Sequence, residues 1–265
     1  MSEKYTIIKP EDNCGMCGYI WQTLRAMYHN PDKKYYVDFS NSIYKINDEN
    51  IWDYFFEQPH TDKYPSESEI ENVVGIIFDQ ESEFLSNEIK PNTEEEIQRR
   101  RLMFNEVIDK YFRLKPEVQE KIDSFVDQNF MGNKVLGVHF RGTDHPDKKH
   151  MDDYMSFIRK KVLDYDKLFI CSDEWDRFRL AEISNKNKAI SYDSIRSKGG
   201  VPLHGHPVYS PHKRVEDFDY QYKIAEDVIV ESYLMSKVDY LVCCSGSNVN
   251  YFSRVINPNL EAIEL

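Results

Sequence analysis

Residues 135–144 read Val-Leu-Gly-Val-His-Phe-Arg-Gly-Thr-Asp, an apolar run that ends in charged and small residues. A short apolar run of this kind is typical of a buried strand in a parallel sheet. We therefore expect a strand that ends at His139, with polar side chains directly after it. Open α/β sheets bind their ligands at the carboxyl ends of the strands. The predicted ligand site begins here with His139, Arg141, Gly142, Thr143 and Asp144.

Beyond residue 144, apolar runs that predict strands alternate with helically spaced segments. The expected elements are strands at 167–171, 189–192 and 240–244 and helices at 152–163 and 222–236. Strands that alternate with helices build a parallel sheet with helices on its faces. The sequence therefore predicts an α/β fold with a Rossmann-like second half.

The first half opens with a similar unit. Residues 4–9 are β-prone, the turn at 10–18 contains glycine, asparagine and aspartate, and residues 20–28 follow helical spacing before a strand at 34–39. This order predicts a β-loop-α-β unit of a parallel sheet. Residues 43–92 mix aromatic residues, acids and prolines without a sustained period. We expect short helices and loops there.

Two helices are expected at the end of the first half. Thr93 precedes three glutamates, which is typical of a helix whose first turn is capped by a threonine side chain. Apolar residues then keep helical spacing as far as Phe112, and a second helix is expected at 116–130. The helical stretch then gives way to a strand, so we divide the chain into an N-terminal lobe, 1–133, and a C-terminal lobe, 134–265.

The composition limits the classes of function. The chain has 265 residues, of which 40% are hydrophobic and 14% aromatic, which is enough for a sizeable core. The net charge of −12 argues against nonspecific nucleic-acid binding, because that binding needs a basic surface. The N-terminus lacks a signal-peptide pattern, and no stretch approaches the length of a membrane span. We therefore expect a soluble cytoplasmic protein without a nucleic-acid partner.

The cysteines and histidines do not predict a metal site. Five cysteines without regular spacing suit a reducing compartment. Cys14 and Cys17 form a CxxC pattern that fits a metal half-site, a redox pair or a tight turn, and we favour the turn because no second CxxC follows. The spacing of His204, His206 and His212 matches no helical or hairpin ligand pair, so we expect no zinc.

The residues after the strand at 135–139 carry the first chemical signal. Arg141 offers a planar fork of donors that suits a diphosphate, and Gly142 lets a ligand approach the backbone closely. The Asp144 carboxylate is suited either to fix the orientation of Arg141 through an ion pair or to bind a sugar hydroxyl. The alternative is an arginine–aspartate pair that only stabilises a turn.

Polar residues also follow two of the strands expected further along the chain, at 167–171 and 240–244. Asp173 and Glu174 follow the strand at 167–171, where they either bind ribose or sugar hydroxyls or begin a helix. Residues 245–248 follow the last strand and either cradle a phosphate with backbone N–H groups or cap a helix. A flexible basic segment between them, 196–204, is able to close over an anion. The binding residues expected from these segments are Asp173, Glu174, Arg196, His204, Ser245, Gly246, Ser247 and Asn248.

The order of these motifs resembles the α-1,6-fucosyltransferase and nodulation fucosyltransferase group, with the O-fucosyltransferases as more distant relatives. The resemblance covers roughly residues 115–260 and is carried by VHFRGTD, by FICSDE and by DYLVCCSGSNV after a helix. It implies a glycosyltransferase-B fold of two Rossmann-like lobes, a GDP-fucose donor, a glycan acceptor, inversion at the anomeric carbon and no metal or other cofactor. The alternatives are a noncatalytic GDP-sugar-binding module and a transferase that uses another GDP-sugar.

The resemblance also implies roles for single residues. His139 would face the guanosine, Arg141 would bind the β-phosphate, and Ser247 with Asn248 would hold the phosphates from the other side. Glu231 stands where the family has an aspartate at the guanine edge.

Two further positions concern catalysis. Gly142 stands where the family has a second arginine, so this chain has one guanidinium in that motif instead of two. The family's catalytic base lies in the loop after Asp144, which is shorter here. The candidates for the base are His145 and Asp147.

Overall fold

The computed structural model describes residues 3–10, 14–45, 49–75, 93–142, 151–198, 203, 218–244 and 246–265. The chain forms two compact units, Met1–Val118 with Glu216–Gln221 and Gln119–Val215 with Tyr222–Leu265. Each unit contains a parallel sheet, so the predicted α/β fold class is confirmed.

The first unit is built on three parallel strands in the order β2-β1-β3, with β1 at Tyr5–Ile8 and β2 at Lys34–Val37. Helix α1, Met16–His29, connects β1 to β2, which confirms the expected β-loop-α-β unit. The third strand, β3 at Ile70–Val74, lies in the region for which we predicted only short helices and loops. The prediction was wrong at Ile70–Val74, because this exposed edge strand has no apolar alternation of its own and is defined by its pairing with β1.

Two helices complete the first unit in the described residues. Helix α2, Trp52–Phe55, buries Trp52 against Phe39 and Phe112. Helix α4 spans Glu94–Tyr111, and the Thr93 side chain accepts a hydrogen bond from the Glu96 backbone N–H at 3.2 Å, which confirms the predicted cap. The Glu96 side chain binds Arg99 and Arg100.

The second unit is a five-stranded parallel sheet in the order β6-β5-β4-β7-β8. Its strands are β4 at Val135–Phe140, β5 at Lys167–Ser172, β6 at Ala189–Ile190, β7 at Tyr240–Cys243 and β8 at Ala262–Glu264. The chain moves outward from β4 through β5 to β6 and then returns to the other side of β4 for β7 and β8. The carboxyl ends of β4 and β7 therefore flank the switch point of a doubly wound sheet.

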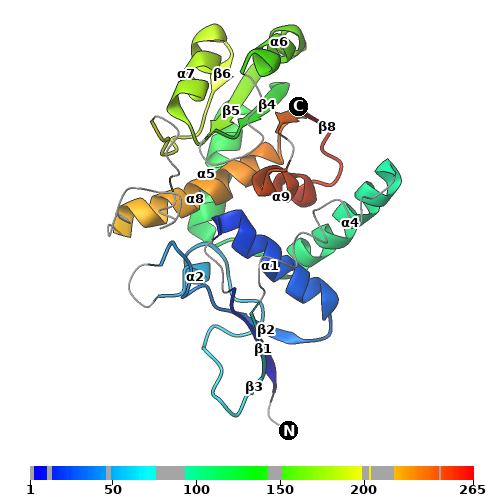
Figure 1. The fold of residues 1–265 in the computed structure, drawn as a ribbon, viewed down its shortest axis with the longest axis vertical. Helices are drawn as coiled ribbons and strands as arrows, with labels where there is room; N and C mark the ends of the chain where they lie inside the picture. The colour runs from blue at the N-terminus through cyan, green and yellow to red at the C-terminus, as the bar shows by residue number, and fades with distance from the viewer. Residues whose placement is uncertain are drawn as a thin grey trace. The chain divides into compact units, whose positions relative to one another are not determined.

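The helices of this unit cover both faces of its sheet (Figure 1). They are α5 at Pro116–Asn129, α6 at Met151–Lys161 with a 3₁₀ turn at Val162–Asp164, α7 at Trp175–Ser184, α8 at Phe218–Met235 and α9 at Asn248–Ile256. Helices α6 and α7 lie on one face, and α8 and α9 lie on the other (Figure 1). The three helices predicted at 116–130, 152–163 and 222–236 are confirmed within a few residues.

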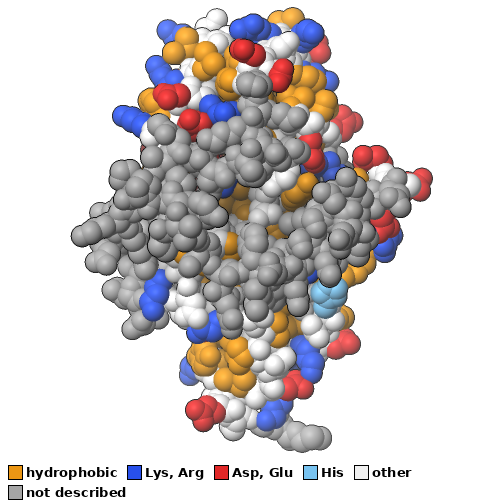
Figure 2. Space-filling model, in the orientation of Figure 1, with side chains coloured by type: hydrophobic (Ala, Val, Ile, Leu, Met, Phe, Trp, Pro, Cys, Tyr) orange, Lys and Arg blue, Asp and Glu red, His pale blue; other side chains and the backbone are white. Residues whose placement is uncertain are grey.

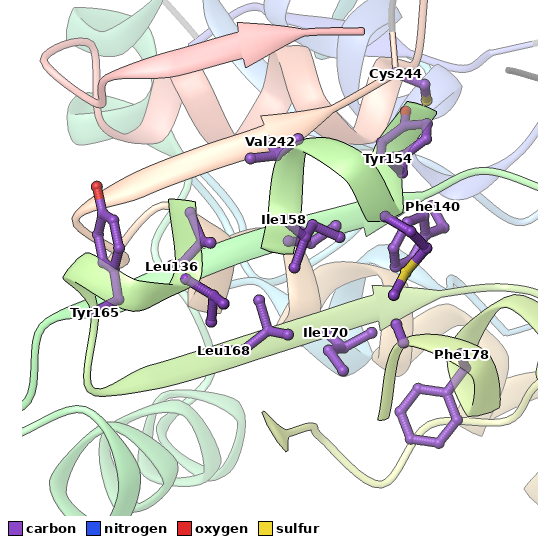
Figure 3. Packing of buried hydrophobic residues seen from close by; sticks show 14 residues of the cluster. Leu136, Phe140, Tyr154, Ile158, Tyr165, Leu168, Ile170, Phe178, Val242 and Cys244 are labelled. Carbon is purple, nitrogen blue, oxygen red and sulfur yellow. The ribbon is translucent and has the colours of Figure 1, made fainter. Parts of the chain in front are cut away.

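The side chains of the central strands alternate between these two faces, as a strand requires. Figure 3 shows Leu136 and Phe140 of β4 and Leu168 and Ile170 of β5 packed with Tyr154 and Ile158 of α6 in one apolar cluster. The intervening Phe169 points the other way, toward Phe125 of α5, with ring centroids 5.5 Å apart. His139 alternates with Phe140, so it belongs to the face that carries α8 and α9.

Candidate functional site

Polar residues gather at the carboxyl ends of β4, β5 and β7. His139 lies near the end of β4 and Arg141 directly follows that strand. Asp173 and Glu174 follow β5, and residues 246–248 lead from β7 into α9. Because these three strands are adjacent, the sheet brings together side chains that are about a hundred residues apart in the chain.

His139 is 4% exposed, and its Nδ1 lies 2.5 Å from Oδ1 of Asn250 in the first turn of α9. The Asn250 side-chain NH₂ donates to the Cys244 carbonyl oxygen at 2.7 Å. This bridge joins the end of β4 to the end of β7 across the switch point. We did not predict Asn250 from the sequence, although a polar residue on the buried face of a short helix is a usable signal.

Arg141 lies against an acid from the neighbouring strand end. Its Nη1 is 3.3 Å from Oδ2 of Asp173, and the other carboxylate oxygen of Asp173 accepts the Gly142 backbone N–H at 2.9 Å. The Arg141 side chain is partly exposed, at 23%. Asp173 therefore orients Arg141 and the backbone after it.

Glu174 lies over the backbone of Gly142. It directly precedes α7, as the helix-start alternative predicted, and its Oε2 accepts a hydrogen bond from Arg177 Nε at 2.8 Å. A Cβ atom added at Gly142 would meet that Oε2 at 2.0 Å and the Glu174 Cβ at 2.8 Å. A residue with a side chain does not fit here unless Glu174 moves.

We expect Gly142→Ala to lower the free energy of unfolding by about 1–3 kcal/mol, because the added methyl group overpacks this contact. Urea unfolding of the single variants and of Gly142→Ala combined with Glu174→Ala measures the coupling between the two positions. Gly142→Ala should lower the free energy of unfolding by less when Glu174 has been replaced by alanine. An equal cost in both backgrounds would contradict the contact.

Arg196 is buried, with only 5% of its side chain exposed. The guanidinium stacks over Phe178 of α7 at 3.9 Å and donates to the carbonyl oxygens of Ser194 and Tyr192. Ser197 continues this packing, since its backbone N–H donates to the Asp173 carbonyl oxygen at 2.8 Å. Arg196 thus stabilises residues 192–197, which follow β6, from within.

Glu231 on α8 faces the same segment. Its Oε1 accepts a hydrogen bond from the Ser194 hydroxyl at 2.6 Å and lies 3.8 Å from Arg196 Nη2, and the side chain is 13% exposed. Burial raises the pKa of the Glu231 carboxyl to about 7, against the opposing effects of Arg196 and Ser194. Glu231 is therefore not a solvated surface acid.

Helix α9 begins where β7 ends. Gly246 has a φ of +72°, a left-handed conformation that glycine adopts without strain, and it turns the chain into the helix. Ser247 is the N-cap residue and is 4% exposed, but within the described residues its side chain makes no capping hydrogen bond. Asn248 opens the first turn, which contains no acidic residue. This helix end has the polarity that attracts an anion.

Several predicted site residues lie outside the described residues. They are Thr143, Asp144, His145, Asp147, His204 and Ser245. The described site residues at the strand ends of the second sheet are His139, Arg141, Gly142, Asp173, Glu174, Gly246, Ser247 and Asn248. Arg196 and Glu231 lie beside Ser194, in the stretch that follows β6.

The apolar character of the helices and the charge of the surface concern binding to membranes and to nucleic acids. Within the described residues, none of the helices has the length and apolar character needed to cross a membrane. On the face drawn in Figure 2, the visible described residues intersperse acidic and basic side chains and form no broad basic patch.

The comparisons with known proteins identify the fold. No protein-family model and no curated protein sequence matches the chain. Among solved structures, fucosyltransferase NodZ from Bradyrhizobium is similar over 100% of this chain and 96% of its own, with a TM-score of 0.60 and 16% identity. A NodZ α-1,6-fucosyltransferase soaked with GDP-fucose gives a TM-score of 0.59, 18% identity and coverage of 100% and 95%. Arabidopsis thaliana FUT1 in complex with GDP gives 0.53, 10% identity and coverage of 98% and 70%.

These structures bear out the resemblance seen in the sequence motifs, and their similarity extends beyond residues 115–260 to the whole chain. At 10–18% identity the likeness is one of fold. The chain therefore has the glycosyltransferase-B fold of the NodZ-type fucosyltransferases.

Proposed function

We propose that this protein is a glycosyltransferase that moves fucose from GDP-fucose to a hydroxyl group of a glycan. One observation carries the proposal: Arg141 and the N-terminus of α9 lie at the ends of two adjacent strands, β4 and β7, in a fold shared with enzymes crystallised with GDP-fucose or GDP. A guanidinium and a helix N-terminus on the two sides of a switch point are suited to a diphosphate.

The donor would be held by residues of the second lobe, 134–265. Arg141, oriented by Asp173, would bind the β-phosphate, while Ser245, Gly246, Ser247 and Asn248 would bind the phosphates from the α9 side. His139 and Glu231 would contact the guanosine. The remaining predicted donor contacts are Gly142, Thr143, Glu174, Arg196 and His204.

The reaction would be a direct displacement with inversion. The oxygen of an acceptor hydroxyl forms a bond to the anomeric carbon of fucose while the bond from that carbon to the β-phosphate oxygen breaks. The hydroxyl proton passes to a base, for which His145 and Asp147 are the candidates, with Asp144 beside them. The electron pair stays on the leaving GDP, where Arg141 stabilises the growing negative charge without a metal.

The acceptor would be a glycan that contacts the first lobe, 1–133. Incubation with GDP-fucose and a glycan panel, with and without EDTA, tests the whole proposal. Release of GDP that depends on an acceptor and survives EDTA supports it, and the anomeric configuration of the product reports inversion. Binding of GDP-fucose without turnover would show a noncatalytic module. Turnover with a different GDP-sugar would correct the donor.

A further inference from the structure

The strongest unassigned feature is the hydrogen-bonded pair of His139 and Asn250. Both side chains are nearly inaccessible to solvent, at 4% and 1% exposure, although the two residues are 111 positions apart in the chain. A buried imidazole and a buried amide at a strand end need matched donors and acceptors.

The environment of Asn250 determines which way its amide faces. The Cys244 carbonyl oxygen can only accept, so the atom of Asn250 that lies 2.7 Å from it is the NH₂ nitrogen. The same nitrogen lies 3.6 Å from the Cys244 sulfur. The amide oxygen is therefore the atom that faces Nδ1 of His139, at 2.5 Å.

This orientation determines the tautomer of His139. The Asn250 oxygen can only accept a hydrogen bond, so Nδ1 of His139 must carry a hydrogen. In the neutral imidazole the other ring nitrogen, Nε2, is then a hydrogen-bond acceptor. The opposite tautomer would place two lone pairs against each other in a buried site, which is costly.

We propose that Asn250 is a positioning residue that keeps His139 in the Nδ1–H tautomer, so that Nε2 accepts a hydrogen bond from an N–H or O–H donor of the bound nucleotide. This inference rests on the proposed function for the identity of the ligand. The hydrogen-bond assignment itself rests on the contacts of His139, Asn250 and Cys244 alone.

Nitrogen NMR of protein labelled with ¹⁵N-histidine tests the tautomer directly. The chain has eight histidines, and the signals that disappear in His139→Gln identify the ring. At about pH 8.5, roughly two units above the ordinary histidine pKa, wild-type Nδ1 should show the shift of a protonated nitrogen and Nε2 that of an unprotonated one. The reverse pattern would overturn the proposal without any binding measurement.

Two substitutions separate positioning from simple packing. Asn250→Ala removes both the contact to His139 and the bond to Cys244, whereas Asn250→Asp keeps an acceptor opposite Nδ1 but replaces the NH₂ donor with an oxygen that faces the Cys244 carbonyl oxygen. Asn250→Ala should mix the tautomers and weaken GDP binding by about ten- to a hundredfold, the scale seen when a metal-binding histidine loses the partner that orients its ring. Asn250→Asp should retain the tautomer and most of the affinity.

Asn257→Ala is the matched control, because Asn257 ends the same helix and donates its side-chain NH₂ to the Ser236 carbonyl oxygen at 2.8 Å without a histidine partner. It should lower the melting temperature but leave the tautomer and GDP affinity unchanged. Equal loss of affinity in Asn250→Ala and Asn250→Asp, or no loss in either, would refute positioning. A wild type with the expected tautomer but no affinity for GDP would refute the proposed function and, with it, the ligand part of this inference.

Discussion

Arg141→Ala should lower fucosyl transfer by about two to three orders of magnitude, because it removes a donor aimed at charge that develops in the transition state. The GDP affinity should fall as well, by the free energy of a charge-assisted hydrogen bond, about 1.5–3 kcal/mol. Asp173, which lies 3.3 Å from the guanidinium, would lose this ion pair, and its negative charge would repel the diphosphate and add to the loss. Turnover with GDP-fucose and calorimetric titration with GDP measure the two effects.

Arg141→Lys should restore only part of the activity, since an ammonium group cannot make the paired bonds of a guanidinium. Arg179→Ala is the control, because Arg179 is an exposed residue of α7 whose ion pair with Glu182 lies on the helix surface. It should leave kcat and KM unchanged. Normal GDP affinity and turnover in Arg141→Ala would remove Arg141 from the site.

Glu231→Gln should abolish a preference for GDP over UDP. A buried carboxylate can accept from the guanine N1–H and exocyclic amine together, and uracil offers no such pair of donors. We expect GDP affinity to fall by about tenfold to a hundredfold while UDP affinity stays the same. Titration of both nucleotides against both proteins measures the ratio.

Asp227→Asn is a matched control for this result. Asp227 lies one turn earlier on α8, is also buried, and accepts the Ile195 backbone N–H at 2.8 Å, so it holds the segment that Glu231 contacts. A structural change in that segment alone should lower the affinities for GDP and UDP by the same factor. If Asp227→Asn alters the ratio as much as Glu231→Gln does, the base preference does not come from the Glu231 carboxylate.

The same residue predicts a pH dependence. Burial raises the pKa of Glu231 to about 7, and guanine recognition needs the ionised carboxylate. Below that pH the carboxyl is protonated, and its proton must be released when GDP binds. The ratio of GDP affinity to UDP affinity should therefore rise by up to about tenfold per pH unit and level off above about pH 7. The phosphates of the two nucleotides titrate alike, so their effect cancels in the ratio. A ratio that is flat from pH 5.5 to 8.5 would contradict the role of the carboxylate.

The sequence predicted those strands and helices whose formation depends on residues close together in the chain. The apolar run ending at His139 became β4, and Thr93 caps α4 as its sequence indicated. Strand β3 was missed because an exposed edge strand has no apolar period of its own. The polar residues after strands β4, β5 and β7 were expected to form a site, and this followed from the rule that parallel strands end at one edge of the sheet.

The partners within that site were decided only by the tertiary structure. Arg141 contacts Asp173, Glu231 accepts from Ser194, and His139 faces Asn250, although each pair is separated by 32 to 111 positions. Sequence periodicity indicates which residues form a strand or a helix, because it depends on neighbours two residues apart in a strand and three or four apart in a helix. The order β6-β5-β4-β7-β8 determines which strand ends are adjacent, and no local pattern contains that order. The local sequence thus determined the α/β class and the polar residues at the strand ends. Long-range packing decided which of these side chains form ion pairs and hydrogen bonds with one another.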